Sequence, residues 1–119
     1  MSKIHLISHK NGITKIKFLV RPSFEQVKLM INEIAKNYPY EKRLWDMSEI
    51  KFDFTADEIK RIAAYGKLKF IKPNRLAIYV LDDLAFGEMR QFEVYREEEG
   101  KSLAGVFRNE HDGIEWLNS

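Results

Sequence analysis

Cysteine is absent from the 119 residues of this chain. Without cysteine there can be no disulfide scaffold, no thiolate metal site and no thiol nucleophile, and nothing points to an oxidising compartment. Proline and glycine are also scarce, with 3 and 6 residues. Neither gathers into a linker or a low-complexity tract, so we expect one uninterrupted domain over residues 1–119.

Long apolar runs are missing too. No stretch approaches the roughly 18 residues that a membrane-spanning helix needs. The N-terminal residues alternate between polar and apolar instead of forming the apolar run of a secretion signal. From these absences we expect a cytoplasmic protein that does not associate with a membrane.

The chain also lacks a large excess of charge of one sign. Its 20 basic and 18 acidic residues give a net charge of +2, which provides no general attraction to nucleic acid or anionic lipid. Residues 60–81 contain lysine and arginine but no acid. We interpret that stretch as a solvated face and expect no nucleic-acid partner, because no nucleic-acid-binding signature accompanies it.

What is present is the composition of an ordinary globular protein. Apolar residues make up 45% and charged residues 32% of the chain, which excludes a wholly disordered protein. A domain of this length can bury about two thirds of its unfolded surface in a single core.

The N-terminal residues predict an antiparallel hairpin. Residues 4–7 and 13–20 have the character of strands, and the Asn-Gly pair at 11–12 between them tolerates positive φ at both positions of a tight turn. The alternation in the second strand places Lys15 and Lys17 opposite the core-facing side chains, so we expect both lysines to point to solvent.

After the hairpin, helical and strand patterns alternate. The predicted helices span residues 23–38, 55–65 and 84–99, with a last one after Asn109. The predicted strands span residues 43–50, 76–81 and 102–107. The resulting order, β-β-α-β-α-β-α-β-α, indicates an α/β fold with a mainly parallel central sheet, an antiparallel edge supplied by the hairpin, and helices packed on the sheet.

Two helix starts carry the same signal. Ser23 with Gln26, and Thr55 with Glu58, are capping pairs in which each side chain can accept a hydrogen bond from the backbone N–H of the other residue. Gly66 is a natural helix end and is expected to close the helix that begins at Thr55.

Three acidic residues follow or end predicted strands. One carboxylate of the pair Asp82 and Asp83 is expected to cap the next helix, where the helix dipole favours acid. Asp46 shares a strand face with Leu44 that should be covered, so its carboxylate needs partners. A charge at the end of the strand, hydrogen-bonded to the adjacent loop, is favoured over a catalytic group.

Catalytic and metal-binding patterns are lacking. No serine sits in a nucleophile elbow, and no Gly-rich phosphate loop is present. Among the three histidines, His5 and His9 would lie about 13 Å apart along a strand, and His111 has only a weak set of neighbouring acids. We therefore expect no enzyme activity, no metal and no cofactor.

Four segments resemble the STAS-like, or SpoIIAA-like, proteins, a family named after sulfate transporters and anti-sigma-factor antagonists. They are Leu44-Trp-Asp-Met47, Phe54-Thr-Ala-Asp-Glu58, Asp83-Leu-Ala-Phe-Gly87 and the segment from Phe107 to Leu117. The resemblance covers nearly the whole chain and looks closest to the uncharacterised bacterial branch. It implies a single STAS-like domain and carries no catalytic signature.

The resemblance also implies a candidate phosphorylation site. In the anti-sigma-factor antagonists, Asp-Ser-Ser-Gly occupies this junction and a partner kinase phosphorylates the second serine. Laid on residues 53–56, the pattern places Thr55 at the modified position, although Phe54 replaces a serine and Ala56 replaces the glycine. A phosphate there would sit at a helix N-terminus, while a plain capping role also explains Thr55.

We expect a regulatory protein partner to bind where the predicted parallel strands end. The candidate binding edge comprises Asp46, Phe52, Asp53, Phe54, Asp57, Asp82, Asp83, Phe86 and Gly87. The alternative is a carrier of a small apolar ligand or nucleotide, with Phe52, Phe54 and Phe86 lining a pocket near the same edge. A homodimer through an exposed strand edge is also left open.

Overall fold

A computed structural model describes residues 4–51, 54–70, 74–96 and 102–119. The strands are β1 (His5–Lys10), β2 (Ile13–Phe18), β3 (Lys42–Asp46), β4 (Asn74–Tyr79) and β5 (Ser102–Phe107), and the helices are α1 (Phe24–Asn37), α2 (Ala56–Lys69), α3 (Asp83–Arg96) and α4 (Glu110–Leu117). This order confirms the α/β architecture predicted from the sequence. None of the helices in these ranges is both long and apolar enough to cross a membrane.

The strands form one sheet in the order β1-β2-β3-β4-β5. β1 pairs with β2 antiparallel, and every later neighbour is parallel. The hairpin turn is formed by Asn11 and Gly12, whose φ angles are 53° and 79°. These positive angles confirm the predicted tight turn.

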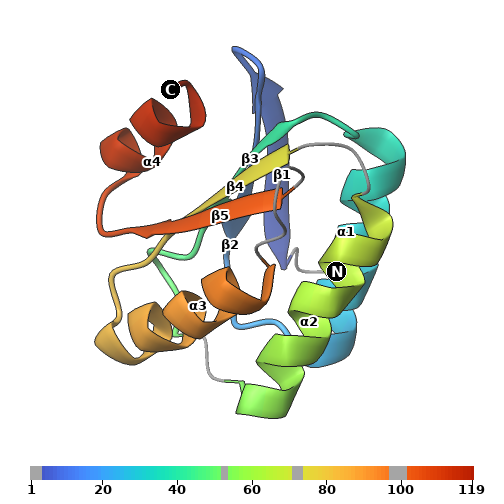
Figure 1. The fold of residues 1–119 in the computed structure, drawn as a ribbon, viewed down its shortest axis with the longest axis vertical. Helices are drawn as coiled ribbons and strands as arrows, with labels where there is room; N and C mark the ends of the chain where they lie inside the picture. The colour runs from blue at the N-terminus through green and yellow to red at the C-terminus, as the bar shows by residue number, and fades with distance from the viewer. Residues whose placement is uncertain (1–3, 52–53, 71–73, 97–101) are drawn as a thin grey trace.

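Helices cover both faces of the sheet. Among the helices of the described residues, α1, α2 and α3 lie on one side and α4 lies on the other (Figure 1). The larger core includes Ile16, Trp45 and Ile78 beneath the three helices. A smaller cluster of Ile13, Leu44, Ala77 and Leu117 fills the space under α4.

Both predicted capping pairs are confirmed. At α1, the backbone N–H of Ser23 donates to Oε1 of Gln26 at 2.8 Å, and that of Gln26 donates to Oγ of Ser23 at 3.2 Å. At α2, the corresponding distances between Thr55 and Glu58 are 3.0 and 3.1 Å. These local bonds fix where two of the helices begin.

The predicted boundaries were wrong at several strands, β2 and β3 among them. β2 ends at Phe18 instead of continuing to residue 20, and Val20 is 49% exposed. β3 ends at Asp46 instead of continuing to residue 50. Oδ1 of Asp46 accepts hydrogen bonds from the backbone N–H and the hydroxyl of Ser48, at 3.0 and 2.6 Å, and this local turn ends the strand.

The prediction that Gly66 ends a helix was also wrong. α2 continues to Lys69, and Gly66 lies buried inside it. A Cβ at this position would stand 3.0 Å from Nε of Arg96. Glycine is therefore present because the Arg96 side chain crosses α2 at close range, and the helix does not need to stop there.

Candidate functional site

The parallel strands β3, β4 and β5 all end at one edge of the sheet, which we call the carboxyl edge. α3 begins shortly after β4, and α4 begins shortly after β5 (Figure 1). The backbone N–H of Phe54, just before α2, donates to Oε2 of Glu88 in α3 at 3.2 Å. The starts of α2 and α3 are therefore close to each other at this edge, where α/β folds commonly bind ligands and partners.

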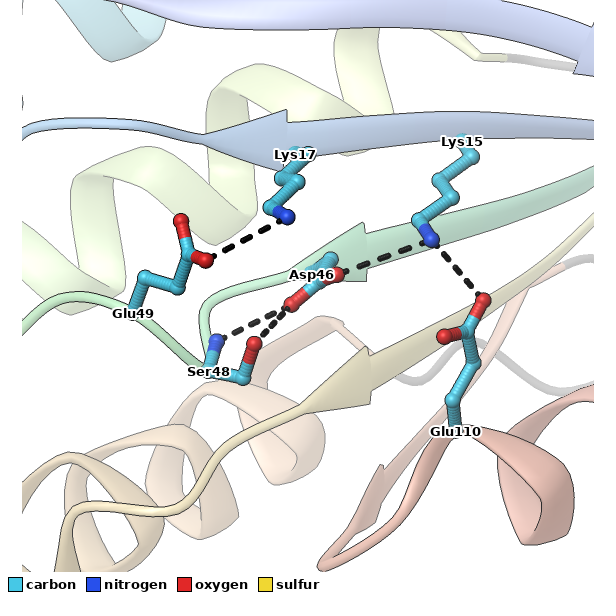
Figure 2. Close-up of polar contacts among 6 residues, drawn as sticks. All are labelled: Lys15, Lys17, Asp46, Ser48, Glu49 and Glu110. Carbon is cyan, nitrogen blue, oxygen red and sulfur yellow. Dashed lines mark hydrogen bonds and ion pairs between the residues drawn. The ribbon is translucent and has the colours of Figure 1, made fainter.

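Asp46 lies at the end of β3 and is 4% exposed. Figure 2 shows its carboxylate between Ser48 and Lys15, with Oδ2 at 3.6 Å from Nζ of Lys15. The expectation that Asp46 sits on a covered face, hydrogen-bonded to the adjacent loop, is confirmed. Its two oxygens are engaged by the loop and by the lysine, an arrangement that serves the fold.

The expectation that Lys15 points freely to solvent was wrong. Its side chain is 32% exposed, and Nζ lies 2.9 Å from Oε1 of Glu110 at the start of α4. α4 covers this face of the sheet, which the strand pattern alone did not reveal. Partial burial lowers the pKa of Lys15, but hydrogen bonding and attraction to Glu110 and Asp46 outweigh it, and the pKa is raised overall.

Lys17 is the neighbouring lysine on the same strand face. Its side chain is 36% exposed and its Nζ lies 3.4 Å from Oε1 of Glu49, which is 55% exposed (Figure 2). This pair is more open to water than the pair of Lys15 with Asp46.

At the start of α2, Thr55 is exposed and its hydroxyl accepts from the N–H of Glu58. Asp57 is also exposed and forms an ion pair with Arg61 at 2.9 Å. Phe54 was predicted at the binding edge, but it is 9% exposed and packs in the main core, so it offers little surface to a partner. Phe52 and Asp53, also predicted at this edge, lie outside the described residues.

At the start of α3, the two aspartates have separate contacts. Oδ2 of Asp82 accepts from the N–H of Ala85 at 3.0 Å, which confirms that one of the pair caps the helix. Oδ1 of Asp83 lies 2.7 Å from Nη2 of Arg108. Gly87, also in the predicted edge, is exposed in the second turn of α3.

Arg108 was missed by the sequence reasoning. Besides Asp83, it contacts the carbonyl of Leu81 through Nη1 at 2.8 Å, and its guanidinium lies 4.2 Å from the ring centroid of Phe86. The available signal was a cation directly after the last strand, which the parallel topology must bring to the same edge as Asp83.

Two exposed leucines lie within two residues of Asp83 in the chain. Leu81 is 52% exposed and Leu84 is 62% exposed. Together with Asp83, Phe86 and Arg108 they form what we call the carboxyl-edge surface. Exposed leucines next to an ion pair, with a half-buried aromatic ring beneath the arginine, give this surface both apolar area and polar anchoring points.

A separate groove lies at the opposite, amino edge, where β3 and β4 begin. It has a volume of about 750 Å³ and is lined in part by Tyr40, Lys42, Lys69 and Asn74. His9 also lines it, with its ring stacked on Tyr40 at a centroid distance of 4.0 Å. The groove comes from residues that the sequence reasoning did not select.

The sequence matches no known protein family, and no curated protein is similar to it. Its structure is similar to the crystal structure of an uncharacterised protein of the DUF3478 family from Shewanella loihica PV-4, described as having a SpoIIAA-like fold. The two chains share 16% sequence identity, each is covered over 98% of its length, and the TM-score is 0.60. This likeness confirms the predicted SpoIIAA-like fold.

Proposed function

We propose that this chain is a non-enzymatic module that binds a regulatory protein partner through the carboxyl-edge surface. The observation that carries the proposal is the exposure of Leu81 and Leu84, at 52% and 62%, beside the ion pair of Asp83 with Arg108. Leucines exposed at adjoining positions of an edge lose water contact when a protein covers them, which favours association.

The local charge pattern supports contact that is mainly apolar. Asp83 already pairs with Arg108, and Asp57 pairs with Arg61 within α2. A partner therefore meets charges that are largely balanced and gains most from burying the leucines. The guanidinium of Arg108 over Phe86 adds a planar surface on which an aromatic or aliphatic group can pack.

The non-enzymatic part of the proposal is supported by how the acids at this edge are used. Asp46 accepts a hydrogen bond from Ser48 and forms an ion pair with Lys15. Asp82 caps α3, and Asp83 forms an ion pair with Arg108. General acid or base catalysis needs a carboxyl that can reach a substrate proton, and these carboxylates already have structural partners.

Thr55 gives the proposal a means of regulation. Its hydroxyl is exposed and belongs to the capping box at the start of α2. A phosphate there would displace Glu58 from the cap and add negative charge at the helix start, beside Asp57. The added charge would change how a partner meets this edge.

The alternative function is a carrier of a small ligand. The groove at the amino edge favours it, since about 750 Å³ lies within the range of small-molecule sites. Lys42 and Lys69 on its wall suit an anionic ligand, and the stacked His9 and Tyr40 rings suit a planar one.

Affinity capture from a native extract separates these functions. Wild type and Thr55→Glu serve as parallel baits, and mass spectrometry identifies proteins and small molecules together. A protein held by wild type and released by Thr55→Glu supports the regulated module. A co-purifying small molecule without any protein partner would contradict the protein-binding module and support the carrier of a small ligand.

A further inference from the structure

The strand β1 forms one edge of the sheet, and β5 forms the opposite edge. β1 keeps a regular register with β2 over its whole length, and its sequence, HLISHK, contains no proline. Edge strands that must stay unpaired are commonly blunted by proline, by bulges or by charges along the strand. The single lysine here, Lys10, stands at the last position of the strand. The middle of this edge is therefore not protected against pairing.

The hairpin determines which backbone groups of β1 face outward. In an antiparallel pair, residues alternate between those that exchange hydrogen bonds with the neighbouring strand and those whose N–H and C=O point away from it. The backbone N–H of Leu19 donates to the carbonyl of Ile4 at 2.8 Å, so every second residue after Ile4 bonds to β2. The outward groups belong to His5, Ile7 and His9, and within the described ranges they form no backbone hydrogen bond.

A second copy of this chain satisfies these groups. When two β1 strands lie antiparallel about a two-fold axis at Ile7, the two Ile7 residues face each other and each His5 faces His9 of the second copy. All the outward N–H and C=O groups then exchange hydrogen bonds across the axis. A register shifted by two residues leaves one outward residue of each copy without a partner in β1. The register centred on Ile7 is thus the one that pairs the whole edge.

The side chains on the face opposite to the main core agree with this register. Leu6 is 45% exposed and Ser8 is also exposed. Across the axis each Leu6 lies beside Ser8 of the second copy, so pairing removes apolar surface from water. The two Lys10 residues stand about 20 Å apart along the strands, beyond the roughly 10 Å over which charges act at physiological salt. Their repulsion therefore does not oppose the contact.

On the other face, α1 contributes an acid beside the edge. Oε2 of Glu33 lies 3.6 Å from Nε2 of His5, and the Glu33 side chain is 46% exposed. Because His5 faces His9 of the second copy, the Glu33 carboxylate stands near an imidazole from each chain. Nδ1 of His9 lies 2.9 Å from the hydroxyl of Thr14. In the tautomer in which Nδ1 accepts from that hydroxyl, Nε2 carries a hydrogen that a carboxylate can accept.

We propose that this chain forms a homodimer in which two β1 strands pair antiparallel about Ile7 and join the two sheets into one. The dimer does not depend on the partner proposed above. The carboxyl-edge surface follows β4 and β5, and β5 lies at the far end of the sheet from β1, so both copies keep that surface exposed. The contact is a single strand of 6 residues, so we expect association to be weak and dependent on concentration.

Analytical ultracentrifugation at pH 8 tests for the dimer over a range of concentrations. We expect wild type to be a monomer at about 5 µM and mainly a dimer at about 0.5 mM. A mass that stays monomeric up to the higher concentration would overturn the proposal.

Two double variants that differ only at position 8 test the register. Leu6→Glu with Ser8→Glu places like charges opposite each other across the axis, whereas Leu6→Glu with Ser8→Lys places opposite charges there. Both variants remove the same leucine and change only exposed positions, so each is the matched control for the other. We expect the first to associate about tenfold more weakly than the second. Equal association of the two variants would contradict pairing about Ile7.

Amide hydrogen exchange of wild type keeps the proposal falsifiable if either variant folds poorly. As the concentration rises, the outward amide of Ile7 should gain protection, because it becomes hydrogen-bonded to the second copy. The amides of Leu6 and Ser8, which already bond to β2, should change less. A dimer in which the amide of Ile7 gains no more protection than its two neighbours would place the interface elsewhere and overturn the proposal.

Discussion

Nζ of Lys15 lies 3.6 Å from Oδ2 of Asp46, so a cation on β2 is paired with a nearly buried carboxylate at the end of β3. Glu110 completes the group from α4, at 2.9 Å from the same Nζ. Three elements that are distant in sequence thus meet at one ammonium group. This contact ties α4 to the sheet face that its apolar cluster covers.

Lys15→Met should lower the free energy of unfolding by about 1–2 kcal/mol, because Asp46 would keep only its bonds to Ser48 in a buried position. Urea denaturation measures the change. Lys17→Met is the matched control on the same strand, and its more exposed pair with Glu49 should be worth less than about 0.5 kcal/mol. Equal losses in the two variants would contradict the role given to Lys15.

The contribution of Lys15 should depend on pH. Its folded-state pKa is raised above the ordinary value of 10.5. The folded state therefore holds the proton more tightly, so the stabilisation is fully present below that value and is lost as pH rises through the folded pKa. The stability difference between wild type and Lys15→Met should be constant from neutral pH towards 10.5 and shrink above it. A stability difference that instead grows above pH 10.5 would contradict a raised pKa for Lys15.

Two helical glycines should respond oppositely to alanine. Gly87→Ala meets nothing within 4 Å, so it should stabilise the chain by about 0.5–1 kcal/mol through helix propensity. Gly66→Ala places its Cβ 3.0 Å from Nε of Arg96, and overpacking beside a buried side chain should make it less stable than wild type by about 1 kcal/mol. Chemical denaturation measures the free energy of unfolding of both variants. Similar gains in stability would show that the Arg96 side chain moves aside freely.

Thr55→Ala should cost about 1 kcal/mol, because the N–H of Glu58 loses its acceptor. Thr55→Ser should retain most of the stability, since serine caps equally well. Thermal or urea unfolding compares the variants. An unchanged free energy of unfolding for Thr55→Ala would show that the capping box contributes little.

Local chemistry explains why much of the fold could be predicted. The Asn11-Gly12 turn and the caps at Ser23 and Thr55 depend on residues within a few positions of one another. The alternation of strands and helices then implied a parallel sheet. Such features are written in short segments and need no knowledge of distant contacts.

Long-range packing explains what could not be predicted. Gly66 was predicted to end a helix because glycine often does so. The side chain that lies close to it, Arg96, comes from another helix, so the local sequence did not reveal the contact. Lys15 was predicted to point to solvent because the strand pattern does not show which face a helix covers. The covering helix, α4, comes from the end of the chain. Sequence showed that Asp46 needs a partner but could not select Lys15, since strand pairing decides which cation lies within reach.

Part of the candidate site was subject to the same limit. The aspartates at the start of α3 could be placed from the capping pattern. Arg108 could be assigned to the same edge only from the structure, in which β5 pairs in parallel with β4. Phe54, predicted to belong to the binding edge or to line a pocket there, packs in the main core instead and is 9% exposed.

The most direct test of the proposed function compares three baits in quantitative capture from a native extract: wild type, Leu81→Gln with Leu84→Gln, and Leu29→Gln with Leu68→Gln. The second pair of leucines is the matched control, being 66% and 69% exposed on α1 and α2. We predict a protein that wild type and the control retain equally and that the carboxyl-edge variant binds about tenfold less, because two leucines no longer leave water on binding. Equal retention by all three baits would contradict binding at this edge.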